Sequence, residues 1–265
     1  MFGHNFEIVE GSPDSRVILH VPHSATFIPP NVRADILLTD SQLQSELDSM
    51  TDTKTEEIAR LAAAQSAIRP WLFINKYSRL VIDPERFPDD REVMNKVGMG
   101  AVYRKTSTGQ NLRSPDFAGE KELLDSYFHP YARAITDLVS QRLNSAGKVV
   151  ILDIHSYRPE QHENAVNHGQ KRPAMCIGTD SFHTSDALKT LGIQSFAPID
   201  DVYENEPYAG TYVPLKHYGV DNFVQAMMME TRADTFLDEK LEFHAGSKTV
   251  IDCLSGLIVG AQLLK

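Results

Sequence analysis

Two apolar runs constrain the fold of this chain more than its other features do. Residues 148–154, KVVILDI, are almost continuously apolar, which is typical of a strand buried on both faces of a parallel or mixed sheet. Residues 16–21, RVILHV, lie between a GSPDS turn and Pro22 and predict another inner strand. Strands covered on both faces need helices above and below them. The runs therefore predict an α/β protein.

The rest of the chain alternates between predicted helices and strands. Helices are expected over 40–65 with a break near MTDT, over 121–146 with a kink at Pro130, in a short segment around 185–190, and over 247–264. After the break, the helix is expected to start at Asp52 or Thr53, because Thr53 and Glu56 match a capping box. Further strands are predicted in SAIRPWLFIN, SRLVID, PAMCIG and NFVQAMMMET.

The domain organisation follows from the absence of repeats and Gly/Ser linkers in the 265 residues. We expect one α/β/α domain over residues 1–265, with irregular lobes at one edge of a parallel or mixed sheet. Residues 84–117 lack periodicity over more than thirty positions, which predicts a functional loop.

Composition narrows the classes of function. The formal net charge of −10 and a pI near 5.4 disfavour nucleic acid and anionic membranes as partners, since both require many phosphates to be neutralised. A small anionic substrate stays possible, because two or three arginines suffice to bind it. The only cysteines, Cys176 and Cys253, lie in apolar stretches and are expected to be inert thiols. With no leader pattern and no membrane-length apolar run, the expected location is cytoplasmic.

Chemistry-bearing side chains follow three of the predicted strands. His23 follows the run over residues 16–21 in VPHSA, and His155 follows the run over residues 148–154 in ILDIHSYRP. Glu230 ends a further apolar run in NFVQAMMMETR. Taken singly, each histidine fits an ordinary hydrogen-bonded role, as do the other eight histidines, His20 and His162 among them. Together, two histidines and a carboxylate at the carboxyl ends of strands fit a hydrolytic zinc site.

Two arginines flank the predicted strand SRLVID. Arg79 and Arg86 could polarise a carbonyl oxygen or hold a carboxylate through the planar guanidinium group. The alternative is pairing with neighbouring acidic residues, which are Asp83, Glu85, Asp89 and Asp90.

These motifs, in their order along the chain, resemble the N-formylglutamate amidohydrolase (N-formylglutamate deformylase) family. The order is VPHS, TDTKTEE, SRLVIDPER, LDIHSY and ETR, and the resemblance spans roughly residues 12–262. The segments LDIHSY and METR are also similar to those of zinc carboxypeptidases and aspartoacylase. The resemblance implies a carboxypeptidase-like, three-layer α/β/α sandwich around a central mixed sheet, with one zinc ion.

The resemblance also implies a set of metal ligands. His23 and His155 match the two histidine ligands, and Asp52 matches the acidic ligand, with Glu56 one turn later as the alternative. Asp153 would orient the imidazole of His155, unless it pairs elsewhere.

Roles for four more residues come from the same resemblance. Glu230 would be the general base that takes a proton from the attacking water and returns it to the leaving amine. Arg79 would stabilise the oxyanion and Arg86 would bind the substrate carboxylate. Tyr208, in EPYAGTY, would lie on a loop that covers the substrate.

Two departures from the family pattern affect the expected substrate. The chain has DPER where the family has DLNR, so that Glu85 takes the place of an amide and would repel an anionic substrate. Ala25 takes the place of a glycine in the first motif.

The expected function is zinc-dependent hydrolysis of a small N-acyl amino acid, N-formyl-L-glutamate first, to a carboxylic acid and a free amino acid. The alternative is a metallopeptidase or amidase acting on a γ-glutamyl, peptidoglycan-like or other acyl amide, which Glu85 and the long loop favour. A third possibility is a non-catalytic metal- or metabolite-binding protein, against which Glu230 argues.

Overall fold

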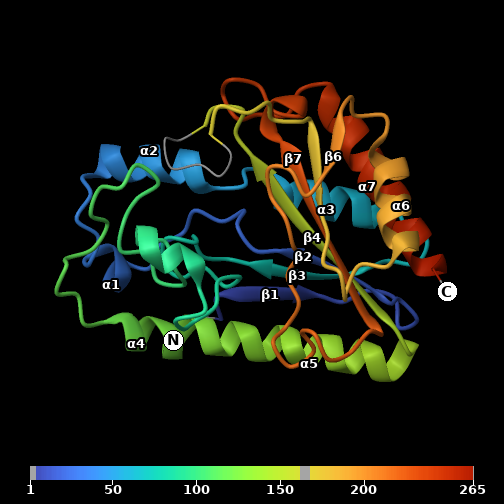
Figure 1. Ribbon diagram of the computed structural model, residues 1–265, viewed down its shortest axis with the longest axis horizontal. Coiled ribbons are helices and arrows are strands. Elements are labelled where there is room, and N and C mark those ends of the chain that lie inside the picture. The colour runs from blue at the N-terminus through green and yellow to red at the C-terminus, as the bar shows by residue number, and fades with distance from the viewer. Residues whose placement is uncertain (1–3, 162–167, 265) are drawn as a thin grey trace.

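The computed structural model describes residues 4–161 and 168–264, and its centre is one mixed sheet of seven strands (Figure 1). The strand order is β1-β3-β2-β4-β7-β5-β6. The strands are β1 (Phe6–Val9), β2 (Val17–Val21), β3 (Trp71–Asn75), β4 (Val149–Tyr157), β5 (Met175–Gly178), β6 (Val202–Glu204) and β7 (Val224–Arg232). Strands β3, β2, β4 and β7 are mutually parallel, whereas β1 is antiparallel to β3 and β5 is antiparallel to β7.

Helices cover both faces of this sheet, as the apolar runs predict. One face carries α3 (Thr55–Ala64), α6 (Asp186–Phe196) and α7 (Gly246–Leu263), and the other carries α5 (His129–Ala146) (Figure 1). The other helical elements are α1 (Pro30–Arg33), α2 (Asp40–Met50), α4 (Glu120–Leu123), a π-helical turn η2 (Leu124–Phe128), and the 3₁₀ turns η1 (Val93–Val97) and η3 (Ala233–Thr235). The three-layer α/β/α fold with a mixed sheet is confirmed.

The two faces of the inner strands differ in chemistry along their length. Successive side chains of a strand alternate between faces. In β4, Leu152 packs towards α3 and α7, and Ile151 packs towards α5. Continuing that alternation, Asp153 and His155 share the α5 face with Ile151. The α5 face is therefore apolar where the strands begin and polar near their carboxyl ends.

The predicted start of the second helix is wrong, because a tertiary contact overrides the local pattern. Thr53 and Glu56 form no capping box: α3 begins at Thr55 after Lys54, whose φ is 67°. The backbone N–H of Asp52 instead donates to the carbonyl of His23, which keeps the junction out of the helix. A capping box does form at Thr39, with Gln42, at the start of α2.

The segment SRLVID is not a strand. Leu80, Val81 and Ile82 are fully buried, but Leu80 and Val81 lie in a turn and Ile82 in the irregular segment after it. They pack in two small apolar clusters with residues of α1, α2 and the 99–128 region. These three side chains are therefore buried by the two clusters beside the sheet, and not by neighbouring strands.

Other elements agree with the sequence patterns. The helix predicted over 121–146 is a helical stretch from Glu120 to Ala146, and the π-helical turn lies just before Pro130. Within the described ranges, no helix is both long and apolar enough to cross a membrane.

Candidate active site

The side chains of His23, Asp52 and His155 converge at the carboxyl edge of the sheet. His23 lies just beyond β2, Asp52 lies between α2 and α3, and His155 lies near the end of β4. Nδ1 of His155 is 3.0 Å from Oδ2 of Asp52 and 3.3 Å from Nδ1 of His23, and the third edge, from His23 Nδ1 to Asp52 Oδ2, is 3.8 Å. All three residues are buried.

This geometry fits a bound metal ion. Ligand bonds of about 2.0–2.1 Å in a tetrahedral site put donor atoms roughly 3.4 Å apart, close to the three edges of the cluster. The donor set of two imidazole nitrogens and a carboxylate oxygen leaves a fourth position open, which is the pattern of catalytic zinc sites. The three atoms could therefore hold one divalent metal ion.

Glu56, the alternative ligand, lies away from the cluster. Its carboxylate accepts hydrogen bonds from Lys76 and Arg60 on the outer side of α3. The structure thus brings Asp52, and not Glu56, to the two histidines.

Asp83 supports the cluster from behind, and the sequence analysis did not give it that role. Its Oδ1 is 3.0 Å from Nε2 of His23, and its Oδ2 accepts hydrogen bonds from Arg79 and from the Tyr103 hydroxyl. A carboxylate on the distal nitrogen fixes the ring orientation of a metal-binding histidine. Burial alone would raise the pKa of Asp83, but the Arg79 guanidinium holds it well below its usual range. The position of Asp83 four residues after Arg79 was the available signal.

Asp153 and His20 form a second buried contact beside the cluster. Oδ1 of Asp153 is 2.8 Å from Nδ1 of His20 and 3.2 Å from Nε2 of His155. Nε2 of His155 also lies 3.3 Å from Oε2 of Glu85. Burial lowers the pKa of His155, but Glu85 and Asp153 outweigh that effect and raise it well above its usual value. Carboxylates that favour a proton on this imidazole also favour a cation beside it. Of the other histidines, His162 lies outside the described residues.

Glu230 lies next to the cluster, because it pairs in register with His155 across β7 and β4. Burial raises the pKa of its carboxyl to about 8, and Oε2 has no hydrogen-bond partner among the described residues. A carboxyl group with its pKa near neutrality and one uncommitted oxygen can accept and return a proton.

A cavity of about 430 Å³ opens above these groups. It is lined by every site residue expected from the sequence: His23, Asp52, Arg79, Arg86, His155, Tyr208 and Glu230. Arg79 is held by Asp83, as the pairing alternative expects, yet it still borders the cavity. Arg86 is looser, with its side chain 31% exposed and its nearest carboxylate oxygen, on Asp83, 3.7 Å away.

Arg172 is a lining residue that the sequence analysis missed. It is buried, and its guanidinium lies 5.3 Å from the ring centre of Tyr208 and 5.7 Å from that of Tyr157. It follows a polar stretch with no periodic pattern, so local sequence gave no signal for it.

Comparison with known proteins defines the class of protein that this fold and site represent. A family model described as N-formylglutamate amidohydrolase matches residues 15–237. The protein is therefore an amidohydrolase, a hydrolase of amide bonds. It belongs to the N-formylglutamate amidohydrolase family.

Solved structures support the fold. An N-formylglutamate amidohydrolase from Ralstonia eutropha JMP134 matches with a TM-score of 0.80 at 18% identity, covering 97% of each chain. A gene product of Agrobacterium tumefaciens matches with a TM-score of 0.72 at 20% identity, covering 98% of this chain and 95% of the other. A metallo-carboxypeptidase from Burkholderia cenocepacia matches with a TM-score of only 0.35 at 14% identity, covering 95% of this chain and 57% of the other. A search of curated proteins finds no match.

Proposed function

We propose that this protein hydrolyses the amide bond of a small N-acyl amino acid with the help of one divalent metal ion, zinc in the first instance. The observation that carries the proposal is the convergence of His23 Nδ1, Asp52 Oδ2 and His155 Nδ1 at one wall of the cavity, beside Glu230. The family description makes N-formyl-L-glutamate the first substrate to test.

The three cluster residues would hold the metal ion, with Asp83 and Asp153 fixing the imidazole rings from behind. A divalent metal ion bound at such a site supplies Lewis acidity, which makes water a stronger nucleophile and polarises a carbonyl.

Glu230 would take the proton from the attacking water and return it to the nitrogen of the leaving amine. Its raised pKa supports this role, since a base with a pKa near 8 can do both at neutral pH. Arg79 would donate to the oxyanion, and Asp83 keeps its guanidinium in place.

Arg86 would bind the carboxylate of the amino acid through its planar fork, and its loose pairing leaves it able to do so. Tyr208 would cover the substrate from the loop after β6, where its ring packs on Tyr157 and beneath Arg172.

Metal analysis and turnover test the proposal together. Purified protein is expected to contain about one equivalent of metal, to release formate from N-formyl amino acids, to lose that activity with a chelator and to regain it with Zn²⁺. Glu230→Gln is expected to keep the metal and lose at least about 100-fold in kcat, in the range for loss of a general base. Glu242→Gln, at an exposed residue paired with Lys54, is the matched control. Turnover that survives complete metal removal would overturn the metal-dependent mechanism.

A further inference from the structure

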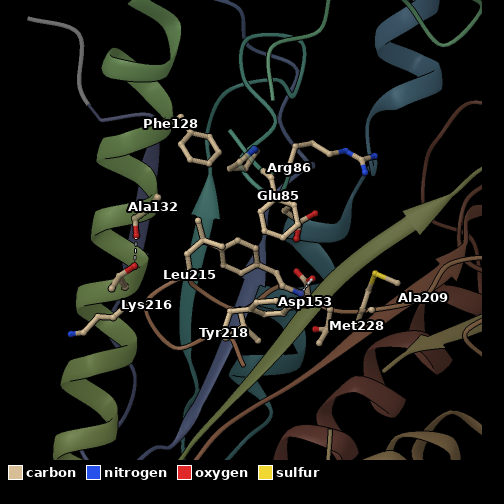
Figure 2. Close-up of a pocket in the computed structure, with 17 residues that line it drawn as sticks. Glu85, Arg86, Phe128, Ala132, Asp153, Ala209, Leu215, Lys216, Tyr218 and Met228 are labelled. Atoms are coloured by element: carbon tan, nitrogen blue, oxygen red, sulfur yellow. Dashed lines mark hydrogen bonds between the residues drawn. The ribbon is translucent and has the colours of Figure 1, made fainter. Parts of the chain in front are cut away.

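A second cavity of about 320 Å³ lies next to the first one (Figure 2). The two cavities share four lining residues, Glu85, Arg86, Ala209 and Met228. Figure 2 shows Phe128 and Ala132 on the helical side of this second cavity, with Asp153 and Met228 on the opposite side. No step of the proposed reaction uses this space.

The lining of the second cavity is mainly apolar and aromatic. Phe87, Phe128, Tyr212 and Tyr218 contribute rings, and Leu215 contributes an aliphatic side chain. An apolar cavity of about 150 Å³ is large enough to hold benzene. The space here is therefore ample for an aromatic or branched aliphatic side chain.

The charged groups around the cavity disfavour a carboxylate inside it. Glu85 and Asp153 both line it, and Oε1 of Glu85 is buried without a hydrogen-bond partner among the described residues. Lys216 also lines it, but its side chain is exposed, and its ammonium group donates to Ser140 on α5 and points away from the cavity (Figure 2). The side-chain carboxylate of a glutamate substrate, placed in this cavity, would meet the like charges of Glu85 and Asp153.

Arg86 links the second cavity to the reaction. It borders both spaces, and Glu230 borders the first. An amino acid whose α-carboxylate meets Arg86 could therefore place its amide nitrogen in the first cavity and its side chain in the second. We propose that the second cavity is the side-chain subsite and that it selects N-acyl amino acids with a large neutral apolar side chain, such as phenylalanine or leucine, over glutamate. This inference rests on the proposed function for the reaction and adds the class of substrate.

A substrate panel tests the inference. The wild-type kcat/KM for N-formyl-L-phenylalanine is expected to exceed that for N-formyl-L-glutamate at least tenfold. Ala132→Phe narrows the cavity from α5 and is expected to lower the ratio of kcat/KM for N-formyl-L-phenylalanine over N-formyl-L-alanine at least tenfold. Arg133→Phe, at the exposed neighbouring position, is the matched control and is expected to keep that ratio. Glu85→Gln is expected to raise the ratio of kcat/KM for N-formyl-L-glutamate over N-formyl-L-phenylalanine at least tenfold.

Equilibrium binding separates this inference from the proposed reaction. Calorimetry with the Glu230→Gln protein is expected to show at least tenfold tighter binding of N-formyl-L-phenylalanine than of N-formyl-L-glutamate. That result, with no turnover by the wild type, would support the subsite and overturn the reaction. Turnover that favours glutamate, or a phenylalanine-to-alanine ratio unchanged by Ala132→Phe in a folded protein, would overturn the subsite and leave the reaction standing.

Discussion

Asp83 joins the candidate metal cluster to Arg79, the residue proposed to donate to the oxyanion. One oxygen of its carboxylate contacts the imidazole of His23, and the other accepts from Arg79 and Tyr103. A buried carboxylate with this many donors stays ionised, and each donor it holds loses its orientation if the charge is removed. The geometry of the candidate site therefore depends on a residue that need not touch substrate.

Asp83→Asn is expected to weaken metal binding 10–100-fold, in the range found when a carboxylate behind a ligating histidine is lost. It is also expected to lower the free energy of unfolding of the metal-free protein by about 3 kcal/mol, since Arg79 is left without its buried partner. A competing chelator measures the first effect and urea unfolding the second. Asp89→Asn, which breaks an exposed pair with Arg91, is expected to change neither appreciably. Unchanged metal affinity in Asp83→Asn would remove Asp83 from the support of the cluster.

At the scale of elements, the packing of α6 against α7 depends on close contacts at small residues. A Cβ atom at Gly260 of α7 would lie 2.5 Å from Cδ1 of Leu191 in α6, whereas a Cβ at Gly256, one turn earlier on the exposed side, would meet no heavy atom within 4 Å. Gly260 must therefore be small for α6 to pack against α7, whereas no described neighbour requires Gly256 to be small.

Gly256→Ala is expected to raise the free energy of unfolding by about 0.5–1 kcal/mol, because alanine is the better helix former and nothing obstructs its methyl group. Gly260→Ala is expected to raise the free energy of unfolding by less, or to lower it, since Leu191 must move to make room for the methyl group. Urea unfolding of the two variants side by side measures the difference. An equal gain in both would contradict the close contact between α6 and α7.

In the molecule as a whole, the candidate metal cluster connects segments that lie far apart in the chain. His23 and His155 are 132 positions apart, and Asp52 comes from the helical layer rather than the sheet. A metal ion bound by all three would hold β2, β4 and the α2–α3 junction together, and the unfolded chain offers no such site.

Zinc is therefore expected to stabilise the fold. At 100 times its dissociation constant, a ligand specific to the native state adds about 2.7 kcal/mol, which for a chain of this size raises Tm by roughly 5–10 °C. Differential scanning calorimetry with and without a chelator measures the shift. His155→Ala is expected to abolish the shift, and His129→Ala, at an exposed position on α5, is expected to retain it. A zinc-dependent shift of the same size in His155→Ala would place the ion elsewhere.

Most elements were predictable because their signals are local. The inner strands β2, β4 and β7 and the helix α7 are long apolar or periodic runs, and the structure confirms them. The misplaced elements, SRLVID and the start of α3, are those where a distant contact overrode the local preference. A capping pattern at Thr53 could not anticipate that the N–H of Asp52 would bond to the carbonyl of His23.

The α/β class, the strand ends that carry His23, His155 and Glu230, and the family could all be inferred from the amino-acid order, because apolar runs and ordered motifs are local features of the chain. Three features needed the folded arrangement: Asp52 rather than Glu56 meets the histidines, Asp83 lies behind His23, and Glu85 borders a second, mainly apolar cavity. The reason is that each of these facts is a distance between side chains from separate segments. Packing sets such distances, and no pattern of neighbours in the sequence contains them.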